Sequence, residues 1–298
     1  MGLDTHGAKF LTYLTQDKPL GETLTLGRQG NHTNWINPKT HRQDKYCEPM
    51  LQKEFGAITV HSLDASDYQK PTFIQDLNRS WEAEGLAEKK YSSILDFGTL
   101  EHVFNVPQAL ESIANACEVG GRIIHVQCHS DFCGHGFWQF SAELFFSWYT
   151  EANGFDDVEV FIAPLNQKNF WLRCINPSGG KRCDLSGKKI PKSYILVTAT
   201  KTRDVEHRSC QQSDYIHKWD KHKQGEAPHI KKRPQKAQTK TRNRSFEKIR
   251  KKLDKLLTKT ARKKLSKKLD QISPFPWWRT PEFIVKVKIN NLIKTNIP

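Results

Sequence analysis

The sequence predicts an α/β fold with a seven-stranded, mostly parallel sheet and helices on both faces. Short β-rich runs alternate with helical patterns through residues 1–203, which is typical of parallel strands joined by crossover helices. The length of 298 residues holds one such domain and an extension. The predicted strands are Thr23–Leu26, Ile58–Leu63, Thr72–Gln75, Ser93–Phe97, Arg122–Gln127, Val158–Ile162 and Tyr194–Thr198.

Two connecting helices have clear ends. Apolar residues recur at helical spacing over 109–117, and Gly120-Gly121 predicts a stop before the next strand. Ser141 can cap the following helix, whose apolar face spans 144–149. Asn153-Gly154 predicts the end of that helix.

Composition divides the rest of the chain. The segment Pro164–Lys192 is rich in Asn, Lys, Gly and Pro, and we interpret it as a surface insertion or a substrate-covering loop. Residues 204–244 are polar and predict a linker, while 245–298 predict a basic amphipathic helix that ends in aromatic residues. We therefore expect one domain over 1–203, a linker, and a C-terminal extension.

The positive charge is concentrated near the C-terminus. The formal net charge is +15, yet 18 of the 47 Lys and Arg residues lie between Lys231 and Lys268, with two acidic residues among them. The remainder of the chain is close to neutral. An anionic partner of the extension therefore does not have to bind the preceding domain.

Cysteine usage and the N-terminus favour a cytoplasmic location. The seven cysteines are odd in number and mostly far apart, so a disulfide framework is not expected. We find no signal-peptide pattern and no apolar stretch of membrane-spanning length. We also predict no metal site, because the paired spacing of closed zinc sites is absent among Cys128, His129, Cys133, His135, Cys174 and Cys183.

The most informative segment is Leu95–Asn105. An apolar strand runs into a small-residue turn, and Glu101-His102 follows at the start of a helix. This run resembles the fourth-strand motif of class I, Rossmann-like methyltransferases that use S-adenosyl-L-methionine, in particular the small-molecule type with Leu-Glu-His-Val after the strand. The segment Cys117–Val126, with Gly120-Gly121 before a strand, is similar to the family's fifth-strand element. The resemblance spans about Leu11 to Lys201.

The resemblance implies a cofactor crevice at the ends of the first, second, third and fourth strands. An acidic side chain after the second strand suits the ribose hydroxyls, and one after the third strand suits the adenine amino group. Turn formation is the alternative role for both acidic residues. The implied cofactor residues are Gly27, Arg28, Asp64, Ala65, Asp76, Leu77, Asp96, Phe97, Gly98 and Thr99.

The first loop departs from the family pattern. Glycines there normally let the backbone approach the methionine part of the cofactor. This chain has Gly27 and Gly30 without the complete G-x-G-x-G run. A variant loop, weaker cofactor binding and loss of activity are all compatible with that departure.

Candidate acceptor-side residues follow the fourth and fifth strands. His102 and His135 are the candidate bases for removing a proton from the acceptor. Capping at the helix start is the alternative for Glu101, and packing is the alternative for the aromatic residues. The predicted substrate-binding residues are Glu101, Phe137, Trp138 and Gln139.

The predicted function is methyl transfer from S-adenosyl-L-methionine to an oxygen or nitrogen of a small molecule or glycan precursor. Residues 231–278 fit a peripheral anionic membrane surface, with an acidic protein or nucleic acid as other partners. Two alternatives stay open: a non-catalytic protein of the same fold acting as a tether or scaffold, and a nucleic-acid methyltransferase recruited by the basic extension.

Overall fold

A computed structural model describes residues 2–33, 44–176, 191–224 and 284–292. The chain divides into one compact unit of residues 1–216 with 281–298, and a second of residues 217–280. The predicted basic helix from Ser245 and the aromatic pair Trp277-Trp278 lie outside the described residues.

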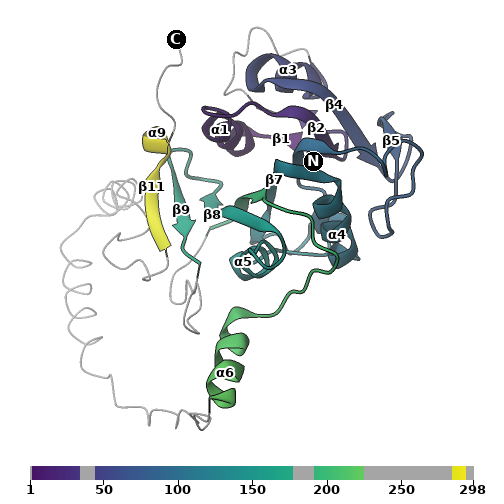
Figure 1. Cartoon of the computed structure of the whole chain (residues 1–298). Coiled ribbons are helices and arrows are strands. Elements are labelled where there is room, and N and C mark those ends of the chain that lie inside the picture. The colour runs from purple at the N-terminus through teal and green to yellow at the C-terminus, as the bar shows by residue number, and fades with distance from the viewer. Residues whose placement is uncertain (1, 34–43, 177–190, 225–283, 293–298) are drawn as a thin grey trace, which may run out of the picture. The chain divides into compact units, whose positions relative to one another are not determined.

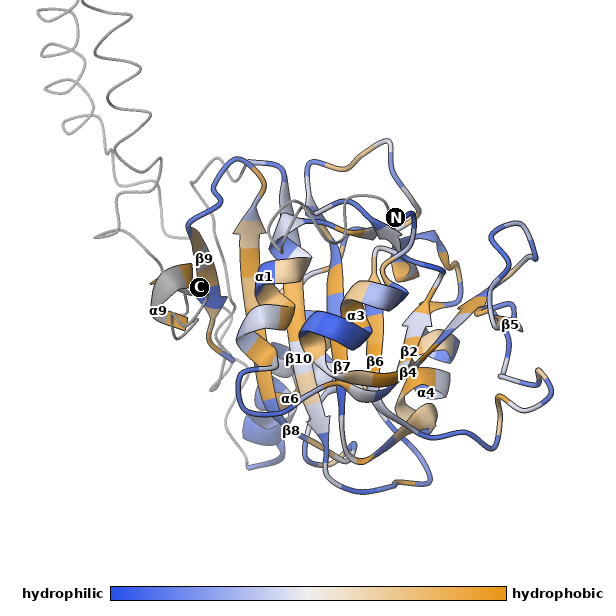
Figure 2. Ribbon diagram, turned by 90° about the horizontal axis from the view of Figure 1, so that it is seen from above, coloured by the Kyte–Doolittle hydropathy of each residue, from blue (hydrophilic) through white to orange (hydrophobic). Residues whose placement is uncertain are grey.

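The first unit is built on a mixed sheet that is parallel at its core. The strand order is β11-β9-β8-β10-β7-β6-β2-β4-β5 (Figures 1 and 2). Neighbouring strands from β5 to β7 pair in parallel, whereas β10 is antiparallel to both β7 and β8. The strands are β2 (Gly21–Leu26), β4 (Ala57–Asp64), β5 (Phe73–Ile74), β6 (Tyr91–Phe97), β7 (Cys117–Ser130), β8 (Phe155–Pro164), β9 (Phe170–Cys174), β10 (Ser193–Lys201) and β11 (Ile284–Lys288).

Helices cover both faces of this sheet. On one face, α1 (Thr5–Leu14) and α3 (Glu48–Phe55) contribute buried residues to one apolar cluster. On the other face, α4 (Val106–Ala116) and α5 (Ala142–Trp148) contribute to a second cluster. Figure 2 shows the central strands as hydrophobic ribbons beneath α1 and α3. Since both faces are buried, the central strands are rich in apolar residues on both sides.

All seven predicted strands are confirmed, with changed ends. The predicted seven-stranded, mostly parallel sheet is wrong in two respects: over the described residues the sheet has nine strands, and it is parallel only at its core, because β8, β9, β10 and β11 pair antiparallel. The interpretation of Pro164–Lys192 as a loop is wrong over β9, which pairs with β8 and with β11. A short strand near the C-terminus could not be paired with β9 by local pattern, because the two lie more than a hundred residues apart in the sequence. A small separate sheet pairs β1 (Gly2–Leu3) with β3 (Gly30–Asn31).

The helix ends combine predicted and unpredicted contacts. Ser141 caps α5 as expected, through its side-chain oxygen and the Leu144 amide. At the end of α4, the ammonium of Lys201 is fully buried and donates to the carbonyls of Ala114 and Cys117. A lysine at this end satisfies carbonyls that have no partner within the helix.

Residues 204–216, with which the predicted linker begins, belong to the first unit. Arg208 binds the carboxylate of Glu111, and the Asn153 amide donates to the Ser209 carbonyl at 2.8 Å. Helix α6 follows at Ser213–Lys223 and the short α9 at Ile289–Leu292. Among the described residues, no helix is both long enough and apolar enough to cross a membrane.

The strand order reverses at the centre of the sheet. From β2 the chain proceeds outward to β4 and β5, and it then returns to the other side of β2 to form β6 and β7. Loops that leave adjacent parallel strands in opposite directions open a crevice at the carboxyl ends, where α/β proteins bind ligands. The segment after β6 stands at this edge.

Candidate functional site

A cavity of about 390 Å³ lies at the carboxyl ends of β6 and β7, beside the start of β10 and the N-terminal segment. Its volume is in the range of small-molecule sites. Four predicted site residues line it, namely Phe97, Gly98, Glu101 and His135, together with Cys128. The structure thus brings the segments after the fourth and fifth predicted strands into one site.

A tight turn after β6 positions Glu101. Gly98 has a φ of +82°, which a residue without Cβ adopts most readily. Asp96 Oδ1 accepts a hydrogen bond of 3.1 Å from the Thr99 amide, and the Thr99 hydroxyl donates to the Leu26 carbonyl at the end of β2. The short 3₁₀ helix η1 (Leu100–His102) follows. This anchored turn directs Glu101 into the cavity.

Glu101 is the centre of a cluster of polar groups. Its side chain is only 2% exposed, and Oε1 lies 3.6 Å from Cys128 Sγ, 3.6 Å from His135 Nε2 and 4.0 Å from His102 Nε2. Its other oxygen, Oε2, has no hydrogen-bond partner among the described residues. Burial, reinforced by the nearby charge of Asp96, raises the pKa of Glu101 to about 7.

The loop that carries His135 is attached to the backbone of Glu101. The amides of Phe137 and Trp138 both donate to the Glu101 carbonyl. Gly136 has a φ of +70°, and a Cβ at this position would lie 2.6 Å from the same carbonyl oxygen. Only glycine therefore lets the loop approach so closely, and His135 is held beside Glu101 as a result.

His102 is the second imidazole of the cluster. Its ring centroid lies 4.8 Å from that of His135, with the two planes at 73°. Burial and the neighbouring His135 lower the pKa of His102. The neutral ring, which can accept a proton, therefore predominates at neutral pH.

Asp96, a predicted cofactor residue, instead belongs to a buried chain of three polar side chains that the sequence did not predict. His125 Nδ1 lies 2.7 Å from Asp96 Oδ2, and His125 Nε2 lies 2.6 Å from the hydroxyl of Tyr149. Asp96 and His125 are fully buried. Asp96 lies two residues after Ile94 on β6, so both side chains point to the same face of the sheet, and Ile94 belongs to the apolar cluster on the α4 side. This alternation along the strand is the signal that could have predicted a buried Asp96.

The loop after β2 is closed by Gln29. Gln29 is 1% exposed, and its amide donates to the Leu26 carbonyl and to Thr99 Oγ1. Gly27 takes a left-handed φ of +71°. Of the predicted cofactor residues near this loop, Thr99 bonds to the loop itself, and Arg28 lines a different cavity.

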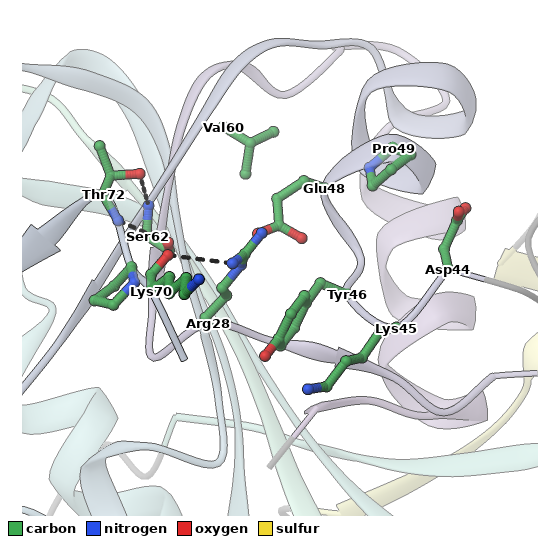
Figure 3. A pocket seen from close by; sticks show the side chains of 11 residues that line it. Arg28, Asp44, Lys45, Tyr46, Glu48, Pro49, Val60, Ser62, Lys70 and Thr72 are labelled. Atoms are coloured by element: carbon green, nitrogen blue, oxygen red, sulfur yellow. Dashed lines mark hydrogen bonds and ion pairs between the residues drawn. The ribbon is translucent and has the colours of Figure 1, made fainter. Parts of the chain in front are cut away.

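This second cavity, of about 440 Å³, lies beside β4 and the start of α3 (Figure 3). Arg28 Nε lies 2.7 Å from Glu48 Oε1, and the guanidinium stands 4.0 Å from the centre of the Tyr46 ring. Arg28 also donates to the carbonyls of Gln69 and Lys70. The side chain is therefore occupied with protein contacts in this arrangement.

The acidic residues after the second and third predicted strands occupy different settings. Asp64 ends β4 and is half-buried, and Ala65 next to it is exposed. Asp76 Oδ1 accepts from both the amide and the side chain of Asn78, and these hydrogen bonds lower the pKa of Asp76. Leu77 is buried in the apolar core. Asp76 therefore organises a turn in this structure.

The predicted substrate-binding aromatics lie outside the lining of the 390 Å³ cavity. Phe137 and Trp138 pack against Phe104, with ring centroids 5.8 and 6.2 Å away. Phe104 is 70% exposed and Phe137 66% exposed. Gln139 accepts a hydrogen bond of 2.9 Å from the Phe132 amide and so stabilises the loop.

Cys128 and His135 come together with a third group that sequence spacing did not suggest. The candidate ligand atoms of Glu101, Cys128 and His135 all lie within 4.8 Å of one another. Spacing along the sequence groups Cys128 with other cysteines and with histidines only. His129, one of those candidates, instead faces the Phe140 carbonyl at 2.7 Å.

Comparisons with known proteins give a likeness in structure alone. No protein-family model matches the chain, and no curated protein does. The solved structures similar to the chain include S-adenosylmethionine-dependent methyltransferases that act on small molecules, and an rRNA methylase of Streptococcus thermophilus is also among them. One is the N-methyltransferase NodS of Bradyrhizobium japonicum in complex with S-adenosyl-L-homocysteine (10% identity, TM-score 0.39, covering 66% of this chain and 86% of that one).

Two further structures match over similar lengths. One is the 1,6-didemethyltoxoflavin-N1-methyltransferase of Burkholderia thailandensis (15% identity, TM-score 0.38, covering 67% of this chain and 78% of that one). The other is an S-adenosylmethionine-dependent methyltransferase of Thermotoga maritima (13% identity, TM-score 0.37, covering 67% and 91%). Scores of this size describe a likeness in chain path and do not identify the substrate of this chain.

Proposed function

We propose that the protein transfers a methyl group from S-adenosyl-L-methionine to an oxygen or nitrogen of a small molecule or glycan precursor. The observation that carries the proposal is the cavity at the carboxyl edge of the parallel strands, with Glu101 and His135 in its wall and His102 beside them. A ligand crevice next to the reversal of strand order is the usual place for such chemistry in α/β folds.

The cofactor would supply an electrophilic methyl group to the acceptor. Phe97 and Gly98 line the cavity and are the residues best placed to contact the cofactor there. Asp64 ends β4 next to β2 and is half-buried, a position that suits a carboxylate accepting hydrogen bonds from two ribose hydroxyls. Gly27 and Ala65 would contribute backbone groups beside it.

The chain's own contribution to catalysis would be alignment and proton removal. Methyl transfer depends chiefly on holding the acceptor atom in line with the methyl group. His102 Nε2 lies 4.0 Å and His135 Nε2 3.6 Å from Glu101 Oε1, and either imidazole can take the proton that the acceptor loses. Glu101, with its raised pKa, can hold a proton near pH 7 and orient an acceptor hydroxyl.

Isothermal titration calorimetry with S-adenosylhomocysteine tests the proposal. We expect binding to the folded chain, and we expect Asp64→Asn to weaken it at least tenfold, the effect of losing about 1.4 kcal/mol of binding free energy. Asp220→Asn, at an exposed position in α6, is the matched control and should leave binding unchanged. If millimolar S-adenosylhomocysteine produces no heat of binding with the folded protein, the proposal that the chain is a methyltransferase is refuted. An unchanged affinity in Asp64→Asn would refute only the ribose site.

One observation favours the second candidate, a non-catalytic protein of this fold. Buried Gln29 joins the end of β2 to Thr99 and occupies the position between two strand ends where a glycine-rich loop would leave room. Absence of S-adenosylhomocysteine binding in the calorimetric experiment, with the fold intact by circular dichroism, is the result this candidate predicts.

For the basic segment 231–278 we propose contact with an anionic membrane surface. The excess of Lys and Arg there is opposed by almost no acidic charge, and each basic residue near such a surface contributes about 1 kcal/mol. Co-sedimentation with phosphatidylcholine vesicles should require phosphatidylserine and should weaken with added salt. Binding to RNA without binding to vesicles would refute the membrane proposal and support recruitment to nucleic acid.

A further inference from the structure

The cluster around Glu101 combines an oxygen, a sulfur and a nitrogen donor from three separate elements. Glu101 lies on η1, Cys128 lies on β7, and His135 lies on the loop after β7. All three line the 390 Å³ cavity. Imidazole, thiolate and carboxylate are together the donor set of zinc sites in proteins.

We propose that Glu101, Cys128 and His135 bind one Zn²⁺ ion in the wall of this cavity. A tetrahedral zinc ion with ordinary bond lengths places its oxygen and nitrogen ligands about 3.4 Å apart, and its oxygen and sulfur ligands about 3.6 Å apart. The corresponding separations from Glu101 Oε1 are 3.6 Å to His135 Nε2 and 3.6 Å to Cys128 Sγ.

Charge and hydrogen bonding both support a cation at this position. Glu101 and Cys128 are 2% exposed, so a carboxylate and a thiolate there have little access to water. A divalent ion would displace the protons of the carboxyl group and the thiol and neutralise the carboxylate and thiolate that result. The unpartnered oxygen Oε2 of Glu101 would gain a partner or a place in the coordination shell.

The site would be open on one side. Three protein ligands leave a fourth tetrahedral position, and the half-exposed side chain of His135 stands at the edge of the cavity. Zinc sites with three protein ligands hold a water molecule or substrate oxygen in the remaining position. The fourth ligand here would be an acceptor hydroxyl or water. With His135 bound to the ion, His102, whose Nε2 lies 4.0 Å from Glu101 Oε1, would be the remaining candidate base of the proposed methyl transfer.

Metal substitution tests the site directly in the full, untagged chain. After removal of metal with EDTA, we expect one Zn²⁺ or Co²⁺ to bind per chain, and the Co²⁺ form to show thiolate-to-metal charge-transfer absorption. Cys128→Ser should abolish that absorption, and Glu101→Gln and His135→Ala should each weaken Co²⁺ binding at least tenfold. Cys133→Ser, an exposed cysteine five residues from Cys128, is the matched control.

Two results would overturn the site. One is absence of Co²⁺ binding to the folded chain, and the other is unchanged affinity in both Glu101→Gln and His135→Ala, which keep Cys128. These two variants also decide the question if Cys128→Ser does not fold, because His135 is about half exposed and Glu101→Gln conserves shape. Zinc binding is measured without S-adenosylhomocysteine. A failure of the zinc proposal can therefore be told apart from a failure of the proposed function.

Discussion

Replacing Tyr149 by Phe tests the buried chain Asp96–His125–Tyr149. The substitution removes one hydroxyl and keeps the ring. His125 Nδ1 faces the carboxylate of Asp96 at 2.7 Å, so with its proton on Nδ1 the ring presents Nε2 as an acceptor to the tyrosine hydroxyl at 2.6 Å. The histidine is fully buried, and water cannot replace the lost donor.

The expected loss follows from these two distances and the burial. A buried acceptor left without its donor costs about 1–3 kcal/mol. For a unit of this size, each kcal/mol corresponds to roughly 2–4 °C in Tm. We therefore expect Tyr149→Phe to lower Tm by about 2–12 °C, with little change in the slope of urea denaturation.

Tyr13→Phe is the matched control. Tyr13 also donates its hydroxyl, to Glu159 Oε2 at 2.7 Å, but the pair is only partly buried and Arg173 contacts the same carboxylate. Water can replace the lost donor there, so the expected loss is about 1 kcal/mol or less. Urea unfolding followed by circular dichroism measures both variants. A loss in Tyr149→Phe no larger than in Tyr13→Phe would show that the reasoning is wrong.

A double-mutant cycle adds a second check on the same chain. Asp96→Asn changes the other end of the chain, which shares His125 with Tyr149. Groups in one hydrogen-bond network usually show coupling energies of about 0.5–3 kcal/mol. Additive effects of Asp96→Asn and Tyr149→Phe would mean that the three side chains do not act as one unit.

Three further variants test other parts of the structure. Gly136→Ala should lower the free energy of unfolding by at least about 1 kcal/mol, because φ is positive there and the new Cβ would meet the Glu101 carbonyl oxygen. Gly134→Ala is the control and should leave the free energy of unfolding unchanged, because the space around Gly134 is open. Lys201→Met should lower the free energy of unfolding by about 3 kcal/mol, because it leaves the carbonyls of Ala114 and Cys117 without a donor. An unchanged urea midpoint would contradict this expectation. Burial lowers the pKa of His6. As the pH falls below about 6.5, His6 therefore takes up a proton in the unfolded chain before it does so in the folded chain, and the free energy of unfolding should decrease. His6→Asn should flatten that pH dependence of the urea midpoint, and an identical profile would refute the assignment.

Local pattern in the sequence predicted much of the fold. The strands of the parallel core are short apolar runs with turn residues at their ends. The pattern of Leu95–Asn105 was therefore sufficient to predict a strand, a turn and a polar pair in that order. The structure then brought Glu101 and His135 into one cavity.

What the sequence did not predict depends on distant partners. Pairing of β9 with β11 joins segments with no shared pattern. The direction of Asp96 depends on which sheet face receives the side chain, and the turn role of Asp76 depends on Asn78. Glu101 lies beside Cys128 only because η1 and the end of β7 meet at the same edge of the sheet.

The pairing of β11 with β9 changes how the basic segment has to be manipulated. Residues 225–283 are followed by a strand that belongs to the first unit, so this segment is an excursion attached at both ends. A protease cut within it would produce two fragments that stay together through β9 and β11 until denaturant is added. Truncation at Lys231 would also remove β11 and uncover the edge of β9, which is a template for aggregation. The informative variant is therefore an internal replacement of the excursion by a neutral linker that keeps Ile284–Lys288.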